Sequence, residues 1–296
     1  MKILTRTIQT ALIFIVIYFL CRSVISNWSK IEGYDWSFDI PMMILSIALY
    51  YFGYAYLPWI LCRMFRYMGY KMSYADVWDI FYVGSLGKYV PGKVWAIAGM
   101  TYMAEKSGVP VQAAGTAVVF AQVYSLLASV LFFIIFLFLR GLDSSSSFLL
   151  WFLPAGAMLV IFIFPKNLER FINLMLVRIG RKPLVLGINS LSAIKVVFYY
   201  LISWTVFGAA FWAMAVAVSG DVVFDPVMTM SAYVIANVVG FLAFFAPGGV
   251  GVREAVLGLL FSGVVPVSVG IVIAVLSRLI VTFVEIINIF IIICNI

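Results

Sequence analysis

The sequence has no histidine, only three cysteines and few charged residues, which make up 10% of its 296 positions. Histidine is the usual general base of phosphatases and acyltransferases and the commonest transition-metal ligand, so its absence excludes most chemistry of that kind. Cys21, Cys62 and Cys294 show neither metal-ligand spacing nor a disulfide framework. We therefore expect the cysteines to be small apolar side chains, and we predict no metal, no cofactor and no catalytic residue.

The scarcity of charge is matched by 65% hydrophobic residues and a mean hydropathy of +1.15. Soluble domains are about 45–50% apolar and about 25% charged. The composition therefore predicts an all-α polytopic membrane protein, with a single transmembrane domain over residues 1–296. The net charge of +7 does not indicate a nucleic-acid partner, because little of such a chain is solvated.

Six apolar stretches are predicted to cross the bilayer, which takes about 20 residues. They are residues 8–25, 40–61, 111–139, 148–164, 196–218 and 268–293. The first lacks the cleavage site of a signal peptide, so we expect a retained span.

Two further segments, 74–107 and 227–263, are apolar but interrupted by Pro-Gly. Their pieces are short, which predicts re-entrant or discontinuous hairpins whose broken backbone is covered by protein or water. Two ordinary short, tilted spans are the alternative for the first segment.

The basic residues predict the orientation of the chain. Most of the 19 Lys and Arg residues lie in the N-terminal segment, in 62–73, in 105–107 and in 165–195. By the positive-inside rule these segments and both termini are predicted to be cytoplasmic. Within the polar loop 165–195, apolar residues recur at helical spacing, which indicates an amphipathic surface helix.

The chain also repeats itself at an offset of 156 residues. This offset aligns Gly84 with Gly240, Pro91 with Pro247, Gly92 with Gly248, and residues 109–111 with residues 265–267. We interpret residues 40–140 and 196–296 as repeat units of opposite orientation, joined by a connecting span and an amphipathic loop over residues 148–195. Inverted repeats of this kind hold their substrate near the membrane midplane, between discontinuous helices.

A half-helix that begins at a Pro-Gly elbow directs its free N–H groups and positive dipole end toward the elbow, where anions bind. Cations flank both elbows, and the oppositely charged residues Arg278 and Glu285 lie in the last span. The candidate substrate-binding residues are Lys88, Pro91, Gly92, Lys93, Gln122, Asn237, Pro247, Gly248, Gly249, Arg253, Glu254, Arg278 and Glu285.

Each charged candidate also has a structural interpretation. The lysines could reach the membrane surface, Arg253 could pair internally, and Arg278 could form a static pair with a carboxylate such as Glu285. Glu254 fits a counter-charge for Arg253, a proton-coupling carboxylate or an acid at a helix start.

Asp76 and Asp79 form an Asp-x-x-Asp pattern, which prenyltransferases use to hold Mg-diphosphate. Acids at the start of a helix explain the same pair. An intramembrane Mg-dependent transferase acting on a polyprenyl phosphate is therefore one alternative function.

The runs GSLGKYVPGKVW (residues 84–95) and FFAPGGVGVREA (residues 244–255) resemble the flippase-like family named for the transmembrane region of lysylphosphatidylglycerol synthases. The resemblance extends over nearly the whole chain, and PGGVGVRE is its most specific part. It implies a stand-alone lipid translocase without a synthase domain, with Arg253, Glu254 and the two Pro-Gly elbows as functional positions. It does not imply lysyl-lipid as the substrate.

We therefore expect the protein to flip an anionic lipid or a polyprenyl-phosphate-linked glycan across the cytoplasmic membrane, through a polar cavity between two opposed hairpins. Its expected partners are membrane lipids and enzymes of envelope biosynthesis. A non-transporting scaffold for envelope-lipid enzymes is the remaining alternative.

Overall fold

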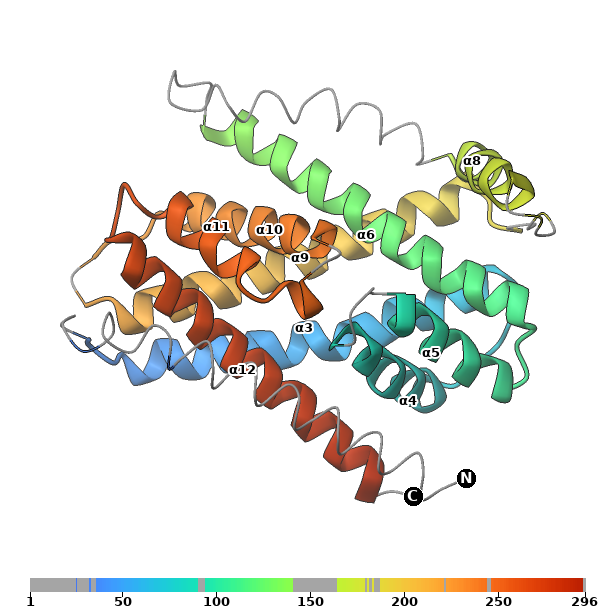
Figure 1. Cartoon of the computed structure of the whole chain (residues 1–296), viewed down its shortest axis with the longest axis horizontal. Coiled ribbons are helices and arrows are strands. Elements are labelled where there is room, and N and C mark those ends of the chain that lie inside the picture. The colour runs from blue at the N-terminus through green and yellow to red at the C-terminus, as the bar shows by residue number, and fades with distance from the viewer. Residues whose placement is uncertain are drawn as a thin grey trace. The chain divides into compact units, whose positions relative to one another are not determined.

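The computed structural model describes residues 36–89, 94–140, 164–178, 187–220, 222–243 and 246–294, together with residues 25, 32, 180 and 183. Within these residues the regular structure consists of α-helices and short 3-10 turns, with no strand (Figure 1). The prediction of an all-helical protein is confirmed for this part of the chain.

Four helices of the described part are long and apolar enough to cross a membrane. They are α3 (Ile40–Tyr67), α6 (Val111–Arg140), α9 (Ser190–Val218) and α12 (Val267–Cys294). Each contains one of the predicted spans, so the protein is a multi-pass membrane protein. The spans predicted at 8–25 and 148–164 lie outside the described residues, apart from Ile25 and Phe164.

Shorter helices occupy the two interrupted segments. The first contains α4 (Tyr74–Ser85), the 3-10 turn η1 (Leu86–Tyr89) and α5 (Val94–Lys106), and the second contains α10 (Pro226–Leu242), the 3-10 turn η4 (Pro247–Gly249) and α11 (Val252–Leu260). In the loop 165–195, α8 (Pro165–Arg178) is strongly amphipathic, as its apolar spacing predicts.

The chain divides into two compact units. Unit 1 comprises Met1–Ala55, Tyr82–Gly99 and Val206–Ile296, and unit 2 comprises Tyr56–Phe81 and Met100–Thr205. The boundaries fall within α3, α4, α5 and α9, so each of these helices contributes to both units.

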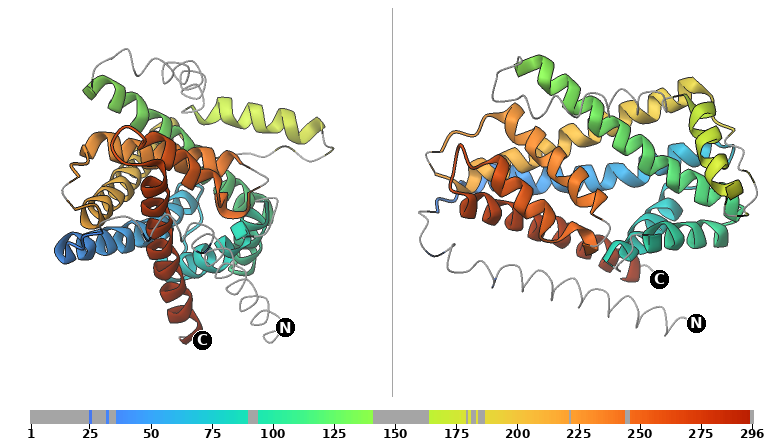
Figure 2. Two further views of the ribbon diagram at one scale, coloured as in Figure 1. Left: turned by 60° about the vertical axis from the view of Figure 1, so that its left-hand side comes forward. Right: turned by 45° about the horizontal axis from the view of Figure 1, so that its top comes forward.

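Unit 1 has an aromatic core around Phe211 of α9. The Phe211 ring lies 4.9 Å from that of Tyr233 and is stacked on that of Phe261 at 5.9 Å. Helices α11 and α12 lie side by side in Figure 2, because glycines face each other where they meet. A Cβ on Gly270 would lie 3.0 Å from the Gly258 Cα. The close approach therefore requires a residue without a side chain.

Unit 2 joins the end of α3 to the start of α9. The ring of Tyr199 meets that of Trp59 edge-on at 4.9 Å, and its hydroxyl lies 3.4 Å from that of Tyr67. The Trp204 indole also donates to the Ser125 carbonyl of α6 at 3.0 Å. These contacts bring the end of α3, which carries Arg66, and the first half of α9, which carries Lys195, together within unit 2.

Replacing Gly270 with Leu should destabilise unit 1 by about 1–3 kcal/mol, the usual cost of overpacking, since the new side chain meets the α11 backbone. Gly263→Leu is the matched control, because a Cβ there meets nothing within 4 Å. Thermal unfolding in detergent measures the stability of both purified variants against that of the wild-type protein. Equal losses in the two variants would contradict this account of the packing.

Candidate functional site

The second Pro-Gly elbow is a glycine turn that packs against α10. Gly248, Gly249 and Gly251 have φ values of 58°, 71° and 82°, in the left-handed region that side chains other than glycine rarely adopt. A Cβ on Gly249 would lie 2.9 Å from the Gly240 carbonyl oxygen of α10. Both the turn conformation and its contact with α10 explain why the sequence PGGVG stands here.

The first elbow contacts the second within unit 1. The turn η1 touches the turn η4, although the two are separated by more than half of the chain. Gly87 in η1 fits closely against the start of α5, since a Cβ there would lie 2.4 Å from the Ala96 nitrogen. Pro91, Gly92 and Lys93, the predicted centre of this elbow, lie outside the described residues.

A buried ion pair fastens the second elbow to α12. The Arg278 Nη1 donates to the Glu254 Oε1 at 2.5 Å, and the Arg278 Nη2 donates to the Gly248 carbonyl at 2.6 Å. The other Glu254 oxygen accepts the Gly251 N–H at 2.7 Å, which caps the first turn of α11. Arg278 and Glu254 are 8% and 3% exposed, so the pair is almost fully shielded from solvent.

This pairing differs from two of the sequence expectations. Glu254 is both an acid at a helix start and a counter-charge, but its cationic partner is Arg278 rather than the adjacent Arg253. Arg278 pairs with Glu254 rather than with Glu285. The reason is geometric, because neighbouring residues of a helix point about 100° apart. Glu254 therefore reaches Arg278 of α12, while Arg253 points toward Tyr233 of α10 and Ser277 of α12.

Arg253 lies on an aromatic ring. Its guanidinium carbon is 4.7 Å from the centre of the Tyr233 ring of α10, and its Nη2 lies 3.4 Å from the Ser277 Oγ of α12. Its Nε has no hydrogen-bond acceptor among the described residues. At 9% exposed, Arg253 is a buried cation with remaining capacity to donate.

Lys88 of the first elbow pairs with Glu285 of α12. The lysine side chain is one-third exposed, whereas that of Glu285 is buried. Lys88 thus binds within the protein instead of simply extending to a membrane surface. Because Arg278 and Glu285 both belong to α12, this one helix is joined by ion pairs to both elbows.

A family model described as the lysylphosphatidylglycerol synthase TM region matches residues 6–287. The chain belongs to this family. The match confirms the resemblance seen in the two Pro-Gly runs. It includes every residue of the elbow cluster, by which we mean Lys88, Tyr233, Gly248, Gly251, Arg253, Glu254, Ser277, Arg278 and Glu285. The comparison with curated proteins gave no match.

Two further predicted residues lie on helices α10 and α6. The Asn237 amide donates to the Tyr233 carbonyl of its own helix at 2.8 Å. Gln122 lies on α6, in unit 2. Sequence reasoning missed Tyr233 and Ser277, because an aromatic or a hydroxyl residue in an apolar helix carries no signal of its own.

Asp76, proposed from the sequence as a magnesium ligand, belongs to a helix cap. The Ser73 hydroxyl donates to the Asp76 carboxylate at 2.6 Å, and the Asp76 N–H donates to the Ser73 Oγ at 3.1 Å. The Ser73 side chain thus satisfies one of the free N–H groups at the start of α4. The transferase alternative stays a prediction that rests on the Asp-x-x-Asp spacing alone.

Arg278→Met should destabilise the protein by about 3–5 kcal/mol, because it leaves the buried Glu254 carboxylate without its cation. The double variant Arg278→Met/Glu254→Met should lose less than the sum of the two single variants, as coupled residues do. Unfolding of the three variants in detergent measures this coupling. Strictly additive losses would show that the two residues do not stabilise each other.

Proposed function

We propose that the protein moves an anionic lipid between the two leaflets of the membrane, and that Arg253 binds the phosphate of its headgroup. The substrate class is a phospholipid or a polyprenyl-phosphate-linked glycan. Membership of a family named for a lipid synthase's transmembrane region supports a role with membrane lipids. The proposal assigns no covalent chemistry to the chain.

The observation that carries the proposal is the distribution of charge at the elbows. Of the three cations there that the structure describes, Lys88 and Arg278 are paired with carboxylates. Arg253 forms no salt bridge within the described residues and retains an unused Nε donor. A planar guanidinium with free donors suits the oxygens of a phosphate.

The environment of Arg253 also suits a site that is empty between substrates. An ionised group at membrane depth is costly unless it is stabilised. The Tyr233 ring and the Ser277 hydroxyl provide that stabilisation without using a carboxylate. A phosphate that binds Arg253 would therefore not have to displace a protein carboxylate from it.

We further propose the membrane arrangement that this function needs, with six spans, two re-entrant hairpins and an inverted-topology repeat in a prokaryotic cytoplasmic membrane. The contact between η1 and η4 supports a common site for the two hairpins. The helices α4, α5 and α11 have 12, 13 and 9 residues, shorter than the roughly 20 residues of a full span. The headgroup would cross at the elbows while the hydrocarbon chains stay in the lipid.

Arg253→Ala should slow lipid translocation roughly tenfold or more, since a hydrogen bond to a charged group contributes about 1.5–3 kcal/mol. The assay follows fluorescent phosphatidylglycerol, and separately a fluorescent polyprenyl phosphate, becoming accessible to dithionite in proteoliposomes. Wild-type protein that moves neither lipid would reject translocation.

Arg63→Ala is the matched control for this experiment. Arg63 also lies over an aromatic ring, 4.8 Å from the centre of that of Trp59, and its Nε also has no partner in the described part of the chain. It stands near the end of α3, away from the sequence of either elbow. Equal loss of transport in Arg63→Ala, or full transport in a folded Arg253→Ala protein, would refute the site.

Reporter fusions test the proposed orientation in a bacterial host. Green fluorescent protein fused after Ile296 should fluoresce, because it folds in the cytoplasm, whereas alkaline phosphatase fused after Asp225 should be active outside. The opposite result at both positions would reverse the orientation. Fluorescence after Ile296 together with inactive phosphatase after Asp225 would place both positions in the cytoplasm and contradict an odd number of crossings between them.

A further inference from the structure

Helix α8 in unit 2 carries an excess of positive charge that the proposed translocation does not use. Its basic residues are Lys166, Arg170 and Arg178, and its one acidic residue is Glu169. The three basic residues are exposed, so their charge is presented to the surroundings of the protein. Such an excess attracts anionic surfaces.

Large apolar side chains are exposed on the same helix. Leu174 and Val177 are 52% and 59% exposed, whereas Leu168 is only 2% exposed. At about 100° per residue, Leu174 and Val177 point away from the side on which Leu168 is buried. The helix therefore packs against the protein through Leu168 and presents cations and hydrocarbon together on its outer side.

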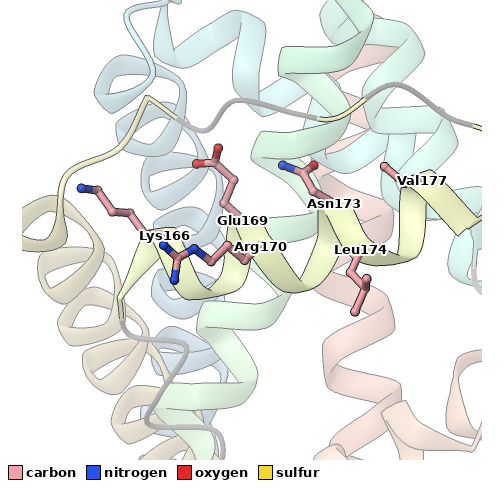
Figure 3. Close-up of a pocket in the computed structure, with 6 residues that line it drawn as sticks. All are labelled: Lys166, Glu169, Arg170, Asn173, Leu174 and Val177. Carbon is pink, nitrogen blue, oxygen red and sulfur yellow. The ribbon is translucent and has the colours of Figure 1, made fainter.

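An open, shallow cavity of about 570 Å³ lies against this side of the helix. Among the described residues, those that line it are Lys166, Glu169, Arg170, Asn173, Leu174 and Val177. Figure 3 shows the two cationic side chains toward the start of the helix and the two apolar ones toward its end. The cavity is thus polar and positive at one end and apolar at the other, within the usual size range of small-molecule sites.

We propose that this cavity binds an anionic phospholipid of the surrounding membrane. Lys166 and Arg170 would contact its phosphate, and Leu174 and Val177 would contact the first part of an acyl chain. A soluble phosphate would leave the apolar end uncovered. An uncharged lipid would leave the net positive charge of the lining unmatched, because Glu169 offsets only one of the two cations. A phospholipid with net negative charge satisfies both ends.

The location of α8 favours lipid as the occupant. The helix belongs to a multi-pass membrane protein, and α9, which is long enough to span the membrane, begins twelve residues after α8 ends. It is therefore tethered near the bilayer surface, where amphipathic basic helices lie with their apolar side chains among the lipids. The inference does not depend on the proposed translocation, because none of these residues belongs to the elbow cluster.

The test uses the full chain in nanodiscs, with Cys21, Cys62 and Cys294 replaced by serine and a bimane label on Val177→Cys. Quenching of the label is compared between doxyl-labelled phosphatidylglycerol and doxyl-labelled phosphatidylcholine at equal mole fraction. We expect the anionic lipid to quench several-fold more strongly, since each basic residue near a membrane surface favours anionic lipid by roughly fivefold. The preference should fall at high salt.

Lys166→Gln/Arg170→Gln should remove this preference without changing the thermal stability of the protein. Lys106→Gln, which neutralises another exposed cation of unit 2 at the end of α5, should leave the preference intact. Equal quenching by the two lipids, or a preference that survives in K166Q/R170Q, would overturn the proposal. Quenching by neither lipid would also overturn it.

Discussion

A broken helix inside an apolar protein leaves backbone groups without partners, and the membrane offers no water to replace them. At the second elbow this problem is solved by one ion pair. Arg278 donates to the Gly248 carbonyl as well as to Glu254, and Glu254 accepts the Gly251 N–H. The pair therefore neutralises two buried charges and satisfies two backbone groups of the turn at once. This small network thus joins the glycine turn, the first turn of α11 and helix α12.

The same network makes α12 the element that both elbows share. Arg278 and Glu285 lie seven residues apart on α12, two turns of one helix, and bind the second and the first elbow respectively. Any movement that separates a turn from α12 has to break an ion pair in which at least one partner is buried. Separating the members of such a pair strongly destabilises the protein. Each elbow is therefore expected to keep one well-defined position against α12.

Much of this arrangement is predictable from the sequence, because hydropathy, Pro-Gly breaks and amphipathic spacing act locally. The four long helices, α8 and the interruption at the second elbow appear where these patterns place them, whereas Pro91 and Gly92 of the first elbow lie outside the described residues. The choice of ionic partners is not local. Glu254 has Arg253 beside it in sequence and Arg278 across from it in space, and only the packing of α11 on α12 selects the second. Tyr233 likewise becomes a partner of Arg253 through packing alone.

Arg63 and Arg253 show how position changes the meaning of one chemical group. Both guanidinium groups lie over an aromatic ring at nearly the same distance, 4.8 Å and 4.7 Å, and both have an Nε without a partner within the described chain. Arg63 stands near the end of a long helix and is partly exposed as a residue, although its Nε atom is buried. Arg253 is buried behind the elbow, where an unused donor is costly to maintain. A cost of that kind is expected where a ligand, rather than the protein, supplies the missing acceptor.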